Sequence, residues 1–451
     1  MVGNNIGSET ARIRGTQSAI VVYVILWVLE GALRKWVPGT ENIMYVARDG
    51  ILLVCMFWLA LRYPSRSKPA AAAFFWTGVW VLTILALLQG LFVEAPVSVL
   101  LAGLRNYLSP LLLPYMALRF GGSSLFDAIG RTDLCFAPLQ LVLVIAQVLT
   151  PTSSFVNAIV GGAEATFTTS DGVVRASGTF SSSLGLSLFS TIVVALSLVW
   201  ITRQAPRDKI LGRTGLLSAV GIIALGGSRS AILAGGIVVA VALAQLIVAR
   251  EARRRASIVF GVLSGAAVSY LIVVWSLPQV VRAFEQRIEN AGASENLADR
   301  IWGGTVGFFS TELSWLGAGA GGHSAFGINL GSGQTWIEDD SVRWVAELGL
   351  LGFLLALARL TAAGVLIVWL ITHLNTAGVE RATLIAVLAP ILLYGSITSL
   401  PTSQGTFAIV ASLLILAWKR ATFSENFPLA TAPAERPASQ ARWTTDKTRA
   451  N

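Results

Sequence analysis

The segment ILGRTGLLSAVGIIALGGSRSAILAGGIVVAVALAQLIVA, residues 210–249, contains two apolar runs on either side of a short polar turn. Each run has roughly 18 residues or more, the length at which a helix crosses the hydrocarbon core of a bilayer. The first run ends at Gly226 and Gly227, and Ser228 and Arg229 stand directly before the second. The segment therefore predicts two consecutive membrane-spanning helices, with an arginine at the start of the second one.

The same pattern recurs along the chain, in which 54% of the residues are hydrophobic and 13% are charged. Lipid allows only helices or closed barrels to span it, and the period-two alternation of a barrel is absent. We therefore expect an all-α protein, a polytopic membrane helix bundle of about 12 transmembrane helices. The expected spans are residues 18–37, 43–62, 71–93, 98–119, 133–150, 184–202, 210–227, 229–249, 256–277, 342–371, 379–400 and 404–419.

Positive residues indicate the orientation of these spans. Lysines and arginines follow the second, sixth, eighth and twelfth spans and also precede the first, as in REARRR at residues 250–255. By the positive-inside rule this side is the cytoplasm, so both termini are expected there, the N-terminus as residues 1–17. Residues 18–277 then hold nine spans with an outer loop at 151–183. A large periplasmic loop with amphipathic helices follows at 278–341, then three spans at 342–419 and a disordered cytoplasmic tail at 420–451.

The positions of the cysteines and of the charged residues exclude several classes of protein. Cys55 and Cys135 both lie inside apolar runs, which indicates neither a disulfide framework nor a zinc site, and we expect no metal and no cofactor. The net charge of +9 arises mainly from short loops between spans, so nucleic acid is not an expected partner. The lipid bilayer is the first partner that the sequence predicts.

Four arginines fall at the outer face in this topology: Arg175, Arg229, Arg300 and Arg343. Arg229 follows Ser228, a good N-cap, at a helix end that already carries partial positive charge. A guanidinium there is unfavourable unless an anion binds, so Ser228 and Arg229 are candidates for an anion site of the phosphate type. The alternative is that Arg229 extends to lipid headgroups or pairs with a carboxylate.

Two further segments carry polar residues at this face. VVRASGTFSSS, residues 173–183, places Arg175 beside a turn rich in serine, threonine and glycine. WIEDDSVRWVAELGLLGFLL, residues 336–355, places Glu338, Asp339 and Asp340 before a span, with Arg343 and Glu347 four residues apart on one helix face. Arg343 and Glu347 form either an intrahelical ion pair or a site in which an arginine binds an anion and a carboxylate abstracts a proton.

Charged residues also occur in the outer halves of early spans: Glu30, Arg34, Arg48, Asp49 and Arg105. A charge at the centre of a membrane helix costs about 2.5–3.5 kcal/mol on insertion scales, so such residues face a bundle interior or a wet cavity. They either line the site or form ion pairs that join the first two spans.

Several of these motifs together resemble the O-antigen polymerase/ligase family, which consists of bacterial integral-membrane glycosyltransferases. They are RASGTF at residues 175–180, SRSAIL at 228–233, GAGAGG at 317–322 and AELGLLG at 346–352, so the resemblance covers roughly residues 170–360. The first spans, with LEGALRKWVPG and VARDG, resemble those of exopolysaccharide polymerase-like members of the family.

The resemblance implies a GT-C-like enzyme of the bacterial inner membrane that needs no metal and has its active site at the periplasmic face. Its donor would be a polyprenyl-diphosphate-linked glycan, its acceptor another glycan, and its further partners chain-length regulator and flippase proteins. A sugar hydroxyl would attack the anomeric carbon, and lipid diphosphate would leave. Arg175 and Arg229 would hold the diphosphate, with Arg300 at the same face, and Arg343 would join them or fix the acceptor.

One departure from the family concerns the base. Ligases of the family typically carry a histidine just before the span that contains E-x-G-x-x-G, where this chain reads IEDDS at residues 337–341. The nearest histidine, His323, lies further upstream and has the alternative of an ordinary loop residue. The base is then Glu338, Asp339, Asp340, Glu347 or His323, and the missing histidine favours a polymerase of oligosaccharide repeat units over a ligase.

Two other classes stay open at the level of the sequence. A secondary transporter or flippase of lipid-linked glycan would also have many spans and buried charges, but its charges should lie near the midplane and its two halves should be similar. A scaffold of an envelope-assembly complex would not need arginines that converge at one face.

Overall fold

The computed structural model describes residues 3–62, 69–160, 174–248, 261, 264–265 and 297–426 of the 451-residue chain. Regular structure within these ranges is helical, without a β-strand. Nine of the described helices are long and apolar enough to cross a membrane. The expected fold class, a polytopic helical bundle of membrane type, is confirmed at this level, whereas the full number of spans stays a prediction.

Eight helices account for the first eight expected spans. They are α1 (Gly3–Trp36), α2 (Glu41–Arg62), α3 (Pro69–Phe92), α4 (Val97–Phe120), α5 (Ser123–Leu149), α6 (Ser183–Thr202), α7 (Pro206–Gly226) and α8 (Arg229–Val248), with a short 3-10 helix η1 (Phe155–Asn157) after α5. All but α2 are among the nine apolar helices, and α2 carries Arg48 and Asp49 within its length. Eight of the expected positions therefore hold helices.

The second half of the chain begins with short helices of the expected large loop, α11 (Leu297–Val306), η3 (Gly307–Ser310) and α12 (Ala325–Asn329). It continues with α13 (Asp340–Leu348), α14 (Leu350–Thr372), α15 (Gly378–Leu393) and α16 (Pro401–Asn426). The expected ninth span at 256–277, apart from 261 and 264–265, lies outside the described residues. So do residues 161–173 and 278–296 of the two outer loops, and the tail from 427.

The single span expected at 342–371 is wrong, because a break at Gly349 divides it into α13 and α14. Gly349 has a φ of +58°, a conformation that favours glycine. After the break α14 packs closely against α13, since a Cβ at Gly352 would lie 1.8 Å from the carbonyl oxygen of Trp344. The apolar periodicity runs through the break, so it did not reveal this change of direction.

Other boundaries also differ from the expectation. The helix expected at 379–400 ends at Leu393, where Arg359 of α14 donates from Nε to the carbonyl of Leu392 at 2.7 Å and so caps the helix end. Conversely, α5 begins at Ser123 and not at 133, because Asp127 and Arg131 lower the hydropathy of a segment that is nonetheless helical. These charged residues shortened the span predicted from hydropathy, although the segment is part of α5.

The turn at Gly227 and Ser228 is a tight connection between α7 and α8. Gly227 has a φ of +56° and ends α7 in the left-handed conformation that helix ends commonly use. The next residue caps α8, since the Ser228 hydroxyl accepts a hydrogen bond from the Ala231 amide at 3.4 Å. The predicted N-cap and the predicted start of the span at Arg229 are therefore confirmed.

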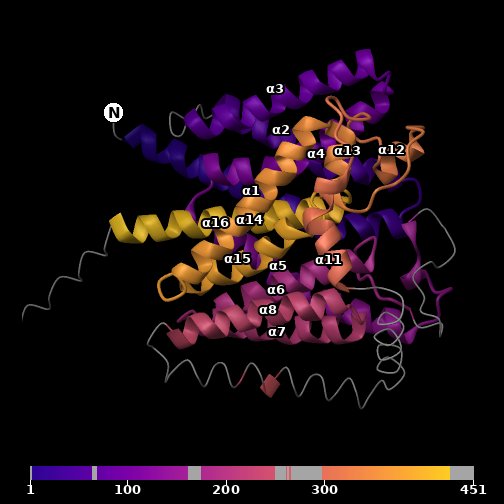
Figure 1. Ribbon diagram of the computed structural model, residues 1–451. Helices are drawn as coiled ribbons and strands as arrows, with labels where there is room; N and C mark the ends of the chain where they lie inside the picture. The colour runs from indigo at the N-terminus through magenta and orange to yellow at the C-terminus, as the bar shows by residue number, and fades with distance from the viewer. Residues whose placement is uncertain are drawn as a thin grey trace, which may run out of the picture.

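Figure 1 shows the long helices running side by side across the view, with α3 at the upper edge and α7 at the lower edge. Helix α6 lies inside the bundle: 89% of its most apolar stretch is buried, compared with 17% for α3. A helix that is apolar on all sides and fully covered by others is a core helix, whereas α3 presents its apolar side chains outward, as a lipid-facing helix does.

Contacts between distant residues define two ends of the bundle. At one end, Lys35 at the end of α1 contacts Ser177 before α6, and Arg48 of α2 contacts Pro401 at the start of α16. Because Arg229 also lies there, we call this the Arg229 end. At the other, the Arg203 end, Arg203 and Arg420 both pair with Asp127. The topology expected from the sequence places the same residues together.

Candidate functional site

The segment that carries Arg175 is held in place by two glutamines of α5. Gln147 accepts hydrogen bonds from the amides of Ser177 and Gly178 at 3.1 and 2.8 Å, and Gln140 accepts one from the amide of Thr179 at 3.1 Å. Gly178 has a φ of +57°, and a Cβ there would lie 2.3 Å from Oε1 of Gln140. The turn therefore needs glycine at this position, and α5 fixes the segment on which Arg175 stands.

Arg175 and Arg229 converge at this end of the bundle. Burial lowers the pKa of Arg175, and the positive charge of Arg229 lowers it further. The Nε of Arg175 is buried with no hydrogen-bond partner within the described part of the chain. The two positive charges repel each other, and a bound anion would reduce this repulsion.

The N-terminus of α8 contributes to the same place. Arg229 and Ser230 are exposed, whereas Ser228 is buried and its hydroxyl lies 3.0 Å from that of Ser230. Because α8 begins at Arg229, the first amides of a 20-residue helix lie beside the guanidinium. A helix N-terminus of this length adds partial positive charge and amide donors to the pair of arginines.

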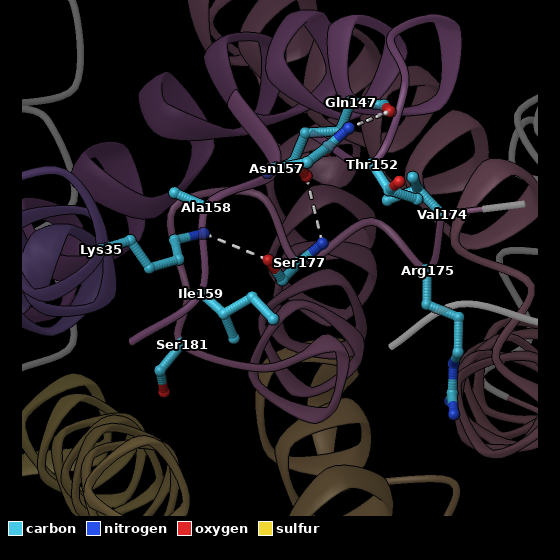
Figure 2. A pocket seen from close by; sticks show the side chains of 10 residues that line it. All are labelled: Lys35, Gln147, Thr152, Asn157, Ala158, Ile159, Val174, Arg175, Ser177 and Ser181. Carbon is cyan, nitrogen blue, oxygen red and sulfur yellow. Dashed lines mark hydrogen bonds between the residues drawn. The ribbon is translucent and has the colours of Figure 1, made fainter. Parts of the chain in front are cut away.

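A small pocket adjoins Arg175. Lys35 enters it from the end of α1 and donates to the hydroxyl of Ser177 at 3.1 Å and to the carbonyl of Gly178 at 2.6 Å. Figure 2 shows Lys35 on one side and Arg175 on the other, with the Arg175 guanidinium extending away from Lys35. The lining residues are Lys35, Gln147, Thr152, Asn157, Ala158, Ile159, Val174, Arg175, Ser177 and Ser181.

Glu347, one of the candidate bases, accepts hydrogen bonds from other parts of the fold. One carboxylate oxygen accepts from the Tyr107 hydroxyl at 2.6 Å and from the Gly321 amide at 2.9 Å, and the other accepts from the His323 amide at 2.9 Å. The side chain is 1% exposed. Glu347 thus anchors the glycine-rich loop GAGAGG, whose backbone turns depend on positive φ at Gly317, Gly319 and Gly321.

Asp340 is engaged in a similar way. One of its oxygens accepts from Arg343 at 2.6 Å, and the other accepts from the amides of Ile397 and of Thr398, the latter at 2.7 Å. Arg343 is buried, donates to the Thr398 hydroxyl as well, and lies 4.0 Å from Glu347. The intrahelical ion pair, one of the two alternatives for Arg343 and Glu347, is present, and these residues fasten α13 to the segment before α16.

His323 lies in the loop that Glu347 anchors. Its Nδ1 is 2.8 Å from the carbonyl oxygen of Thr335. A carbonyl only accepts, so Nδ1 carries the proton in the neutral ring and Nε2 keeps its lone pair. The backbone of His323 is held on both sides, since its amide donates to Glu347 and its carbonyl accepts from Ile337. In the neutral ring, the contact at Nδ1 therefore leaves Nε2 as the nitrogen that can accept a proton.

The other candidates occupy more open positions. Glu338 is exposed, and Asp339 is half-buried at the start of α13, next to Gly304 of α11. Arg300 lies in α11, but its side chain is outside the described residues. The structure thus brings Arg175 and Arg229 together and, separately, Asp340, Arg343, Glu347 and His323.

The charged residues of the early spans form a buried network. Arg48 donates to Glu30 and to Asp49 at 3.0 Å each, and Arg105 donates to Asp49 at 2.6 Å. Arg34 lies 3.4 Å from Glu30. These are the ion pairs expected for the first spans, and they join α1, α2 and α4. Arg48, which contacts both Glu30 and Asp49, is only 1% exposed.

Sequence reasoning missed several polar residues at this end: Lys35, Gln89, Tyr107, Gln147, Thr398 and Gln404. Gln89, for example, donates to the Glu347 carbonyl at 2.7 Å and accepts from the Ala320 amide at 2.8 Å. Apart from Thr398, they are long polar side chains within or at the end of an apolar run, which is typical of a bundle-facing position. Within the described ranges, no group of three or more histidine, cysteine or acidic residues could hold a metal ion.

Comparison with models of protein families and with curated proteins finds no match to this chain.

Proposed function

We propose that the chain is a bacterial inner-membrane glycosyltransferase that polymerises polyprenyl-diphosphate-linked oligosaccharide repeat units at the periplasmic face. The leaving group is the lipid diphosphate. Arg175 and Arg229 bind it at the N-terminus of α8, and the base that accepts the proton of the attacking hydroxyl is His323, Glu338 or Asp339. This assignment extends the resemblance of the sequence motifs to the O-antigen polymerase/ligase family.

The convergence of Arg175 and Arg229 is the observation that carries the proposal. The positive charge of Arg229 adds to the cost of charging Arg175, and this cost falls when an anion lies between them. A planar guanidinium binds two phosphate oxygens at once, and the amides of α8 supply further donors. The negative charge that develops on the diphosphate as it leaves is therefore stabilised by groups already in place.

The reaction needs one bond to form and one to break. The acceptor hydroxyl oxygen attacks the anomeric carbon of the donor, whose bond to the diphosphate oxygen breaks with both electrons going to that oxygen. The hydroxyl proton passes to the base. Because the arginines are not consumed, their contribution is to bind the diphosphate more tightly as its charge grows.

The environment of the carboxylates supports His323 as the base. Both oxygens of Asp340 and of Glu347 already accept hydrogen bonds within the fold, so protonation of either residue would break contacts that hold α13. The ring of His323 has its Nδ1 proton directed at a carbonyl and Nε2 available to accept. Glu338 and Asp339 are the remaining alternatives, and their single substitution tests them.

The experiment that tests the function is the lipid-linked glycan profile of a strain lacking the chain. Accumulation of single repeat units on the polyprenyl carrier is the expected result. Polymer retained on the carrier would show a ligase instead, which transfers the glycan to another acceptor. A strain with normal polymer, or with intermediates confined to the cytoplasmic leaflet, would overturn the assignment, the latter in favour of a flippase.

A further inference from the structure

A polar stripe runs along one face of α5, a helix apolar enough to cross the membrane. Asp133, Gln140 and Gln147 follow one another at intervals of seven residues, which is about two helical turns, so they share a face. All three side chains are buried. The two glutamines hold the segment before α6, whereas neither carboxyl oxygen of Asp133 has a hydrogen-bond partner within the described part of the chain. Asp133 is therefore the member of the stripe whose polar group the fold leaves unused.

The turn of α5 around this carboxyl packs against α6 and α7. A Cβ at Gly130, one turn earlier, would lie 2.2 Å from the ring of Trp200 of α6. A Cβ at Gly215 of α7 would lie 2.5 Å from Leu134 and 2.8 Å from the hydroxyl oxygen of Ser197 of α6. The residues just before and just after the carboxyl therefore contact the Ser197–Trp200 turn of α6.

This turn of α6 holds two further polar groups without partners. The hydroxyl of Ser197 and Nε1 of Trp200 are buried, and neither has a hydrogen-bond partner among the residues that the structure describes. Both groups are donors, which a carboxylate requires when it is removed from water. In the packing described, neither donates to Asp133.

No described cation compensates for a charge on Asp133. Asp127 lies six residues earlier, about 9 Å along the helix axis, and pairs with Arg203 and Arg420. Within the described ranges Asp133 itself has no ion pair or other electrostatic partner. The other titratable side chains described on α5 and on the helices packed against it are Arg131 and Cys135 on α5, Arg207, Asp208, Lys209 and Arg213 on α7, Lys419 on α16, and Tyr23, Glu30, Arg34 and Lys35 on α1.

A neutral carboxylic acid fits these surroundings, whereas a carboxylate does not, because an ionised group without donors or a cation is strongly disfavoured inside a membrane bundle. We propose that Asp133 is a proton-binding site within the membrane. It carries a proton in the packing described and releases it when α5 shifts against α6, so that Ser197, Trp200 or water donates to the carboxylate. Release breaks the carboxyl O–H bond, leaves the electron pair on the oxygen and transfers the proton to water. This site is independent of the proposed glycosyl transfer.

Infrared spectroscopy of the purified full chain tests the proposal, because the C=O stretch of a protonated carboxyl is separate from the bands of carboxylates and amides. The detergent must lack ester groups, whose carbonyl band overlaps with it. Asp133→Asn keeps the shape of the neutral acid and removes its band. Asp127→Asn is the matched control on the same helix, since Asp127 is partly exposed and paired with two arginines.

At neutral pH the wild type and Asp127→Asn should show the same carboxylic-acid band, and isotope labelling of the aspartate side-chain carboxyl carbon should shift it. The band should be lost in Asp133→Asn, and in the wild type it should disappear as the pH rises. The melting temperature of Asp133→Asn should equal that of the wild type at neutral pH. At alkaline pH it should exceed the wild-type value, because folding then requires Asp133 to keep a proton that the asparagine does not need.

Three results would overturn the proton site. They are a wild-type spectrum without an aspartic-acid band at neutral pH, a band that persists in Asp133→Asn, and a melting temperature of Asp133→Asn well below that of the wild type at neutral pH. The last would indicate a carboxylate that binds a cation. The isotope-labelled wild type decides whether an aspartic acid is protonated even if Asp133→Asn fails to fold. None of these measurements depends on glycosyl transfer, so the proposed function is tested separately.

Discussion

Arg175 and Arg229 come from the turn before α6 and from the first residue of α8, yet they lie close enough for the charge of one to lower the pKa of the other. Like charges are brought together in a fold only where other interactions hold the segments that carry them. Here α5 holds the Arg175 segment through Gln140 and Gln147, and the turn at Gly227 and Ser228 sets the start of α8.

Substitution of Arg229 tests that relationship. Arg229→Ala should abolish nearly all polymer formation, while its thermal stability in detergent without ligand should equal or exceed that of the wild type, because a repulsion has been removed. Arg229→Lys should keep part of the activity, since it retains the charge and loses the bidentate geometry. The measurement is the melting temperature of each protein with and without polyprenyl diphosphate. The same ligand-induced shift in wild type and Arg229→Ala would refute the site.

Substitution of His323 should lower the rate, whereas substitution of Glu347 should lower the stability. His323→Asn preserves a donor for the Thr335 carbonyl but removes the base, so the rate should fall about 10²–10⁴-fold with little change in melting temperature. Glu347→Gln keeps the shape of the side chain but leaves buried amide donors poorly matched, and should cost about 3–5 kcal/mol of stability. Polymer assays and thermal unfolding on the same preparations distinguish the two roles. If Glu338→Gln or Asp339→Asn abolishes polymer and His323→Asn does not, the base is the acidic residue.

The contact between α13 and α14 predicts a difference between two glycines of the same helix. Gly352→Ala would place a methyl group within 1.8 Å of the Trp344 carbonyl, so α13 must shift, and we expect a loss of about 1–3 kcal/mol together with lower activity. Gly364→Ala has no atom within 4 Å of the new methyl group and should be neutral or stabilising by about 0.5–1 kcal/mol. Chemical denaturation of both variants is the comparison to make, and equal stabilities would contradict the packing described.

The orientation of the bundle predicts which surfaces are accessible from outside the cell. In a background without Cys55 and Cys135, Ser153→Cys at the Arg229 end should react with an impermeant thiol reagent in intact spheroplasts. Gln204→Cys, which is exposed at the Arg203 end, should react only after the membrane is opened. The reverse pattern would place the site in the cytoplasm, where the expected donor chemistry would not apply.

The parts of this protein that depend on local properties could be predicted from the sequence alone. Length and hydropathy located the helices, and the glycine pair with Ser228 marked the end of α7 and the start of α8, because helix caps depend on only a few neighbouring residues. The expectation that the non-topological arginines cluster at one face came from counting spans, since each crossing reverses the side of the membrane. Of these arginines, Arg175 and Arg229 lie close enough for their charges to interact.

The structural role of several charged residues could be recognised only from the fold. Asp340, Arg343 and Glu347 have the same side chains in a catalytic site as in a buried ion pair, and their roles depend on partners far away in the sequence, such as Thr398 and Gly321. The division of one apolar run into α13 and α14 likewise depends on Gly349 packing against the loop near Trp315, which periodicity does not record. Lys35 acquired a pocket only when the end of α1 came to lie against the segment around Ser177, a contact between residues 142 positions apart.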